Sequence, residues 1–251
     1  MAFTTVDNPE LYFQTKLYTG NSSTQSITLD GSENMQPDWV WIKARSDAGN
    51  HAIYDSVRGA TKRLTSEGDN AESTVSNGLT AFNSDGFSLG AGGNENSATN
   101  IVAWNWKAGS SVSGNTTGSG TAKSYTGSVS TTAGFSIISF TGNGTSGHTI
   151  PHNLGVAPAW VIVKRYDSTN NWRVGHNGLT SWQYRLTLEL TDAQGSQSAV
   201  FNSTAPSSSV VTLGNSGSAN GNGATYIMYS FAEKKGYSKF GSYTGNGNAD
   251  G

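Results

Sequence analysis

Short apolar runs with the signals of β-strands, separated by polar turn residues, dominate the chain. Residues 184–190, with the sequence YRLTLEL, alternate strictly, which is typical of a strand with one buried and one solvated face. No segment of helical length shows a helical period, apart from a short turn expected after Asp7. Runs rich in β-branched and aromatic residues, bounded by Gly, Asn, Ser or Pro, occupy residues 39–43, 101–106, 135–140, 159–164, 208–213 and 226–231. The pattern predicts an all-β protein of antiparallel, jelly-roll-like β-sandwiches.

Several phrases recur along the chain in the same order. The string YTGN at residues 18–21 returns as FTGN at 140–143 and as YTGN at 243–246. PDWVWIK at 37–43 is matched by PAWVIVK at 158–164, and the LG pair at 89–90 by the pair at 213–214. A period of about 120 residues is the size of a domain and far longer than a solenoid repeat. We therefore expect two tandem β-sandwich domains, at residues 1–110 and 123–240, and the start of a third repeat at 241–251.

The two expected domains are separated by a segment of small polar residues. Residues 109–122 read GSSVSGNTTGSGTA, with no charge and one aliphatic side chain larger than Ala. This composition predicts a flexible linker over residues 111–122. Because the third copy stops soon after its first phrase, we also expect the natural protein to continue past Gly251.

Composition limits the chemistry that the chain can perform. Only 13% of residues are charged, and the net charge of −2 gives no broad basic field for nucleic acid. There is no cysteine, which excludes disulfides, thiolate metal sites and a Cys nucleophile. No run is long enough to span a bilayer. We expect no nucleic-acid partner, no membrane insertion, no cofactor, no metal site and no enzymatic activity, although Asp38, Asp47, Asp55 and Glu189 could still converge as a carboxylate pair.

Long strings of the sequence resemble a known family. These strings include FQTKLYTGNSSTQSI, NGLTAFNSDGFSLG and NIVAWNWKAG in the first half, and TAGFSIISFTGNGTSGHTIPHNLGVAPAWVIVKR and FAEKKGYSKFGSYTGNGNADG in the second. They are similar to a repeated β-domain found in tail fibre and virion structural proteins of tailed phages, especially phages of marine bacteria. The resemblance implies a location on the virion, as a tail fibre, spike or head appendage, and a role in host attachment. A capsid decoration protein and a glycan depolymerase are the alternatives.

Tryptophans are the main candidates for contact with a carbohydrate. Trp172 and Trp182 lie in polar, loop-like surroundings and are expected at the surface, where an indole can stack on a sugar ring. The other candidates are two pairs spaced two residues apart in strands, so that each pair points to one face of a sheet. For these pairs, Trp39 with Trp41 and Trp104 with Trp106, we favour a place in the core, and a sugar-stacking row is the alternative interpretation.

The start of the chain is more apolar than a free tail requires. We expect this segment to dock on another virion protein or on further copies of the chain. Small β-domains gain stability and avidity from symmetric association, so a homo-oligomer is expected, most plausibly a trimer. A host-surface glycan is the other expected partner. The predicted docking residues are Phe3, Leu11, Tyr12, Phe13 and Leu17.

Overall fold

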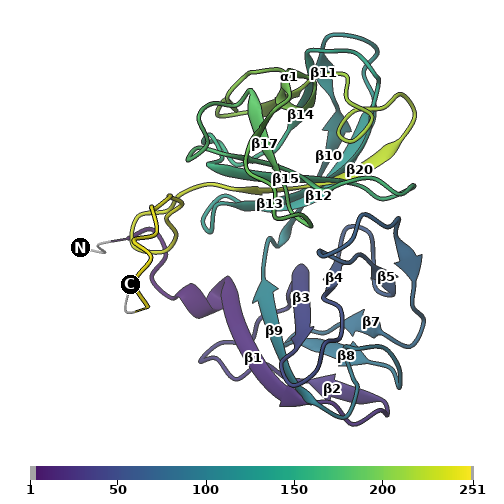
Figure 1. Ribbon diagram of the computed structural model, residues 1–251. Helices are drawn as coiled ribbons and strands as arrows, with labels where there is room; N and C mark the ends of the chain where they lie inside the picture. The colour runs from purple at the N-terminus through teal and green to yellow at the C-terminus, as the bar shows by residue number, and fades with distance from the viewer. Residues whose placement is uncertain (1–3, 250–251) are drawn as a thin grey trace.

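In the computed structural model, which describes residues 4–249, the chain folds into two β-units that lie one against the other (Figure 1). We call residues 4–108 the first unit and residues 109–240 the second unit. The all-β antiparallel fold expected from the sequence is confirmed. None of residues 241–249 belongs to a helix or strand, so the start of a third repeat there stays a prediction. Within residues 4–249 no helix is long and apolar enough to cross a membrane.

The first unit begins with a single 3-10 turn and then contains only strands. Its elements are η1 (Pro9–Leu11), β1 (Phe13–Thr19), β2 (Gln25–Ile27), β3 (Trp39–Ala44), β4 (Ala52–Asp55), β5 (Lys62–Arg63), β6 (Ser73–Thr74), β7 (Leu79–Phe82), β8 (Phe87–Leu89) and β9 (Asn100–Trp106). A four-stranded sheet of order β1-β9-β3-β4 packs against a three-stranded sheet of order β2-β8-β7, and β5 pairs with β6.

The core of the first unit follows from the two-residue period of β3. Val40 and Ile42 point to one face of the strand and are buried against Leu79, Phe87 and Leu89 of the smaller sheet. Trp39 and Trp41 therefore point to the opposite face, away from this core. The sandwich thus has an inner face of aliphatic residues and an outer face of indoles.

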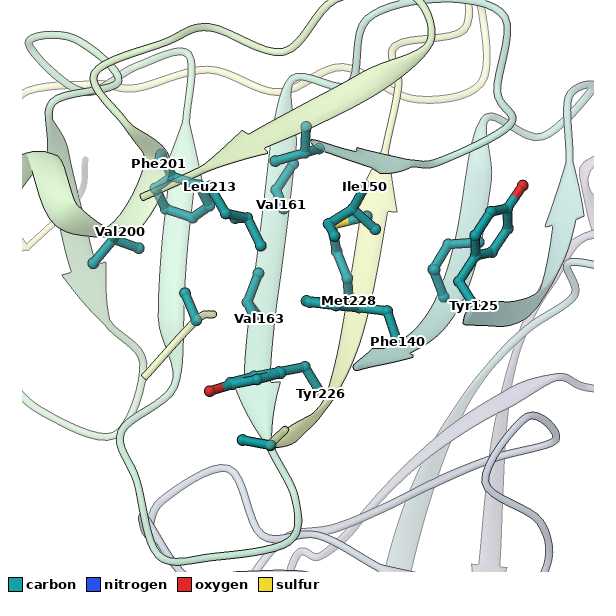
Figure 2. Packing of buried hydrophobic residues seen from close by; sticks show 14 of the residues in the cluster. Tyr125, Phe140, Ile150, Val161, Val163, Val200, Phe201, Leu213, Tyr226 and Met228 are labelled. Atoms are coloured by element: carbon teal, nitrogen blue, oxygen red, sulfur yellow. The ribbon is translucent and has the colours of Figure 1, made fainter. Parts of the chain in front are cut away.

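The second unit has the larger sheet of the two. Its elements are β10 (Ser110–Asn115), β11 (Thr117–Gly118), β12 (Ser124–Ser130), β13 (Phe135–Thr141), β14 (His148–Pro151), β15 (Trp160–Arg165), β16 (Arg173–His176), β17 (Tyr184–Thr187), β18 (Gly195–Ser196), α1 (Ser198–Phe201), β19 (Val210–Leu213) and β20 (Thr225–Phe231). The sheet order is β10-β12-β13-β20-β15-β16-β17-β18, and a smaller sheet β11-β14-β19 covers one face. Figure 2 shows Val161, Val163 and Met228 of the large sheet facing Ile150 and Leu213 of the small one.

The three strand pairings of the first unit's larger sheet have counterparts in the large sheet of the second unit. The order β1-β9-β3-β4 in the first unit matches β13-β20-β15-β16 in the second. The register matches as well, because Tyr18 pairs with Ile101 and Trp39 with Trp106, while Phe140 pairs with Tyr226 and Trp160 with Phe231. Since these are the positions at which the sequence phrases repeat, similar phrases occupy similar places in each unit.

The shared YTGN and FTGN phrases end β1 and β13 in the same way. A Cβ atom on Gly20 or on Gly142 would collide with a neighbouring backbone, so only glycine allows the close approach. The next residue donates its backbone N–H to a buried amide side chain: Asn21 to Asn96 Oδ1 at 3.1 Å, and Asn143 to Asn220 Oδ1 at 2.9 Å. The phrase is therefore a structural element of each sandwich.

The outer face of the first unit's larger sheet packs on the second unit. Trp39, Ile53 and Leu64 from the first unit form one apolar cluster with residues of the second unit's large sheet. The Trp39 ring lies 4.7 Å from the ring of Tyr229 and 5.7 Å from that of Phe135, measured between centroids. Trp39 is therefore buried in the contact between the units, not in the core of its own sandwich.

A buried ionic cluster accompanies this apolar contact. The Tyr229 hydroxyl of the second unit donates to Asp55 Oδ2 of the first at 2.7 Å, and Arg58 Nε donates to the same oxygen at 2.6 Å. Burial raises the pKa of Tyr229 well above its ordinary value, and Asp55 adds to the shift. Burial opposes the charge of Arg58, but Asp55, Tyr229 and Glu72 hold its pKa above the usual value. Tyr229 thus remains protonated and Arg58 charged, as this arrangement requires.

Residues 65–72 of the first unit also bond directly to the second unit. Trp172 Nε1 donates to the carbonyl oxygens of Thr65 and Gly68 at 3.0 and 3.1 Å. Lys164 Nζ donates to the Asp69 carbonyl at 3.0 Å, and the backbone N–H of Glu72 donates to the carbonyl of Tyr166 at 2.9 Å. These bonds fix the orientation of one unit relative to the other.

The prediction of a flexible linker at residues 111–122 was wrong. Most of this segment forms β10 and β11, and β10 pairs with β12 along its full length. An edge strand needs its backbone N–H and C=O groups more than large side chains, so Ser, Thr and Gly serve there. The one larger aliphatic residue, Val112, packs against the core of the second unit. The second unit therefore begins before residue 123.

Candidate functional site

Four tryptophans form a block on the outer face of the first unit's larger sheet. Trp39 pairs across the sheet with Trp106, and Trp41 pairs with Trp104. Because residues two apart on a strand share a face, all four indoles lie on the same side. In the pair nearer the second unit, Trp39 is only 1% exposed, and Trp106 is half-buried and packs against the cluster between the units. The pair farther away, Trp41 and Trp104, remains half-buried and borders solvent.

We call Trp41, Trp104 and their strand neighbours Thr15 and Leu17 the aromatic surface. The rings of Trp41 and Trp104 meet edge to face, with centroids 6.5 Å apart and planes at 82°. Thr15 lies directly across the sheet from Trp104 and is exposed. Leu17, two residues further along β1 and on the same face, is 58% exposed. Side chains from three adjacent strands thus present an apolar patch with a polar margin.

His51 orients one of the two indoles. Trp41 Nε1 donates to His51 Nδ1 at 2.7 Å, so this imidazole nitrogen acts as the acceptor and the proton of the neutral ring is on Nε2. Burial lowers the pKa of His51 from its ordinary value, with the Glu67 carboxylate opposing and the Lys43 ammonium reinforcing the shift. His51 is therefore neutral at pH 7 and the bond to Trp41 is retained.

Lys43 adds the nearest positive charge to the aromatic surface. It lies on the same face of β3 as Trp41, and its Nζ donates to the carbonyl oxygens of Ala44 at 2.7 Å and Asp47 at 3.3 Å. These bonds hold the turn that follows β3 beside the indoles. Indole faces attract the C–H groups of a sugar ring, and hydroxyls and an ammonium at the margin can bond to its oxygens. The arrangement suits an uncharged or weakly acidic saccharide.

The predicted surface tryptophans are in the interior, and this prediction was wrong. Trp172 is fully buried in the contact between the units, where its indole N–H bonds to two carbonyls of the first unit. Trp182 is 8% exposed and packs edge to face on Phe201 at 5.4 Å in the core of the second unit. Polar sequence neighbours misled the prediction, because loops fold these side chains inward. Neither indole can stack on a sugar in this structure.

The predicted docking residues divide into partly buried and exposed positions. Phe3 lies outside the described residues. Tyr12 meets Tyr237 edge to face at 6.5 Å, and Phe13 lies 4.9 Å from the Trp106 ring. Leu11 is half-buried, which leaves Leu17 as the exposed member of the set.

The acidic residues considered for catalysis each have a separate structural partner. Asp38 accepts from the backbone of Ala108 at 2.9 Å, and Asp55 bonds to Arg58 and Tyr229. Glu189 accepts from Asn171 at 2.6 Å, and Asp47 from the backbone of Gly49 at 2.7 Å. Among residues 4–249 no three His, Asp or Glu side chains gather in a way that could hold a metal ion.

The comparison with known proteins gives a family and no activity. No curated protein and no solved structure matches the chain. Residues 8–251, nearly the whole sequence, match the family DUF7483, which is described as a domain of unknown function. The chain therefore belongs to the DUF7483 family.

Proposed function

We propose that this protein is a structural component of a tailed-phage virion and that it contacts a host-surface glycan through the aromatic surface of its first unit. The observation behind the glycan contact is the half-buried pair of Trp41 and Trp104 beside the exposed Leu17. The resemblance of the sequence to phage tail fibre and virion proteins supports the location. Other virion proteins and further copies of the chain are the proposed partners.

The polar, weakly charged composition supports a glycan in preference to a polyanion. With 13% charged residues and a net charge of −2, the chain offers hydroxyls, amides and aromatic rings rather than ions. A single stacking contact of this kind binds weakly, because only one face of the sugar is covered. Many copies on one particle convert weak contacts into firm attachment, because each bound copy raises the effective concentration of the next.

The rigid contact between the units supports a structural role. The apolar cluster around Trp39, the Asp55–Arg58–Tyr229 cluster and the bonds of Trp172 and Lys164 to carbonyls of the first unit all join the two sandwiches. Interfaces between domains of one chain are often small and permit relative motion. A fixed orientation suits an appendage that must hold a binding surface away from the particle.

Binding of purified host polysaccharide by calorimetry tests the glycan contact. We expect Trp104→Ala and Trp41→Ala each to weaken binding at least tenfold, which is about 1.4 kcal/mol. Tyr243→Ala is the matched control, because Tyr243 is an aromatic residue with 94% exposure outside the aromatic surface. Equal binding by all four proteins would refute the site, and shortening of the polysaccharide by the wild type would favour a depolymerase instead.

Electron-microscopy reconstruction of the virion tests the location. Density for the two sandwiches in a fibre, spike or appendage, with the aromatic surface facing outward, is the expected result. Density over the junctions between capsid subunits would instead make the protein a capsid decoration protein. Density nowhere on the particle would refute the virion assignment.

A further inference from the structure

The outer edge of β1 is open, although the corresponding edge in the second unit is paired. β1 is the first strand in the order β1-β9-β3-β4, and Figure 1 shows it along the outer side of the first unit. Its counterpart β13 lies inside its sheet, with β12 and then β10 beyond it. Residues 4–8, which precede η1, form no strand. Within the described chain, the position that β12 fills in the second unit is therefore empty in the first.

The hydrogen bonds of β1 show which groups face outward. Tyr12 accepts from the backbone of Lys107 and Gly20 donates to that of Thr99, so the even-numbered residues bond to β9. The N–H and C=O groups of Phe13, Thr15 and Leu17 therefore point away from the sheet. Among residues 4–249 none of these three has a hydrogen-bond partner.

The second unit shows how such an edge is completed in this fold. The residues that correspond to Phe13, Thr15 and Leu17 are Phe135, Ile137 and Ser139. They pair in antiparallel register with Ser130, Ser128 and Thr126 of β12. A strand seated on this edge is thus part of the architecture of one unit and is missing from the other.

We propose that β1 pairs with β1 of a second copy, antiparallel and about a two-fold axis through Thr15. In this register Thr15 faces Thr15 of the second copy, and Phe13 faces its Leu17. All the free N–H and C=O groups of the three residues are then used, because each such pair exchanges two hydrogen bonds. The exposed Leu17 gains an aromatic neighbour on the same face, and Lys16, already paired with Asp30 at 3.0 Å, faces Gln14.

Other registers of the pairing between two β1 strands fit the edge less well. A register centred on Lys16 would place two ammonium groups opposite each other across the axis, which disfavours pairing. A register centred on Leu17 would require Thr19, whose carbonyl already accepts from Gln25 Nε2 at 3.3 Å. Two β1 strands therefore pair best when the two-fold axis passes through Thr15. The product is an isologous dimer with a continuous eight-stranded sheet, in place of the trimer expected from the sequence.

The pairing has a consequence for the aromatic surface but does not depend on glycan binding. Trp104 of β9 lies directly opposite Thr15 of β1, on the same face of the sheet. The dimer therefore places the two Trp41–Trp104 pairs on one face of the joined sheet. Two such surfaces on one rigid sheet would act on neighbouring saccharides together. The dimer is tested by assembly alone, and its failure leaves the glycan proposal standing.

Cross-linking at the axis is the direct test, because the chain contains no cysteine of its own. In Thr15→Cys, the two introduced residues would be about 5.5 Å apart between Cα atoms, which is within disulfide range. We expect oxidation to give a covalent dimer. In Leu17→Cys the two positions lie about 14 Å apart along the strands and should cross-link at least tenfold less. Leu190→Cys, at an exposed apolar position outside β1, is the control for random collision.

Analytical ultracentrifugation completes the test without a cross-link. The wild type should sediment as a dimer. Thr15→Pro, which removes only an outward N–H, and Leu17→Glu, which places charge at the edge, should each raise the dimer dissociation constant at least tenfold. A wild-type monomer at the highest soluble concentration would overturn the proposal. So would a trimer, or a dimer that Leu17→Glu does not weaken and that Thr15→Cys does not trap.

Discussion

Replacement of Trp39 by alanine should destabilise the protein far more than the same change at the matched position Trp160. Trp39 is 1% exposed, and its ring centroid lies within 6 Å of five others, those of Trp41, Trp106, Phe135, Tyr229 and Phe231. Trp160 occupies the corresponding strand position but is only half-buried, with ring contacts to Phe231 and Phe240. The two tryptophans occupy matched positions of the repeated phrases, but only Trp39 is fully buried.

The magnitude follows from the buried area. An indole that buries ~200 Å² at ~25 cal/mol per Å² contributes about 5 kcal/mol as an upper limit. Large-to-small changes of buried aromatic residues cost about 3–5 kcal/mol, which we expect for Trp39→Ala. For the half-buried Trp160 we expect about 1–2 kcal/mol, because roughly half of the area is involved.

Trp39→Phe separates ring packing from the indole N–H. Trp39 Nε1 is buried and has no hydrogen-bond partner in the part of the chain that the structure describes. A phenyl ring keeps most of the stacking on Tyr229 and removes this unpaired donor. We therefore expect Trp39→Phe to cost less than about 2 kcal/mol, well below the alanine variant.

Urea unfolding, followed by tryptophan fluorescence and by circular dichroism, measures these differences. The contact between the units should make the wild type unfold in one transition, and Trp39→Ala should lower its midpoint or divide it into two steps. The reasoning is refuted if Trp39→Ala and Trp160→Ala lower stability equally. It is also refuted if the loss in Trp39→Ala is below about 1.5 kcal/mol.

Buried polar groups and the first strands of the second unit give three further predictions. Burial lowers the pKa of His148, so its contribution to stability is complete above pH ~6.5 and falls as pH drops through that value. His148→Gln introduces the residue type that Gln25 supplies at the matched position of the first unit and should reduce this loss in acid unfolding curves, with the parts due to His51 and His152 remaining. Burial likewise lowers the pKa of Lys164 to about 8, so the unfolded chain binds more protons at this group once pH exceeds ~8. Between pH ~8 and ~9, where buried tyrosines such as Tyr229 and Tyr237 with raised pKa values are still protonated in both states, this contribution should make stability rise with pH; Lys164→Met should flatten the rise, whereas an unchanged slope would contradict the assignment. Limited proteolysis should spare residues 109–122, because β10 and β11 are paired in sheets, and early cleavage there by a broad-specificity protease would show that these strands open readily.

Part of the fold could be predicted from the sequence because it depends on local patterns. Runs of β-branched and aromatic residues such as residues 159–164 favour strands wherever those strands are placed, and here β15 is buried on both faces. The repeated phrases mark the ends of β1 and β13 because a glycine is required where a neighbouring backbone approaches closely. The sequence also indicated that Trp41 and Trp104 belong to strands and share faces with Trp39 and Trp106.

The sequence could not decide which tryptophans reach solvent. The four indoles of the first sheet have similar neighbours along the chain, yet Trp39 is fully buried in the cluster between the units, whereas Trp41 only packs against the margin of that cluster and stays half-buried. Trp172 was expected at the surface because its neighbours in sequence are polar, yet Asn170 donates its backbone N–H to the Asp69 carbonyl of the first unit and the indole N–H bonds to two further carbonyls there.

The structure of residues 109–122 was also decided by tertiary contacts. Small polar residues form either a flexible linker or an edge strand, and the choice depends on whether a partner strand offers its N–H and C=O groups. Here β12 and β14 provide them. Local sequence patterns therefore determined the strands of this protein. Burial and exposure were determined by contacts between residues 95 to 190 positions apart, such as Lys164 with Asp69 and Trp39 with Tyr229, which are set by how the two units pack and not by any local pattern.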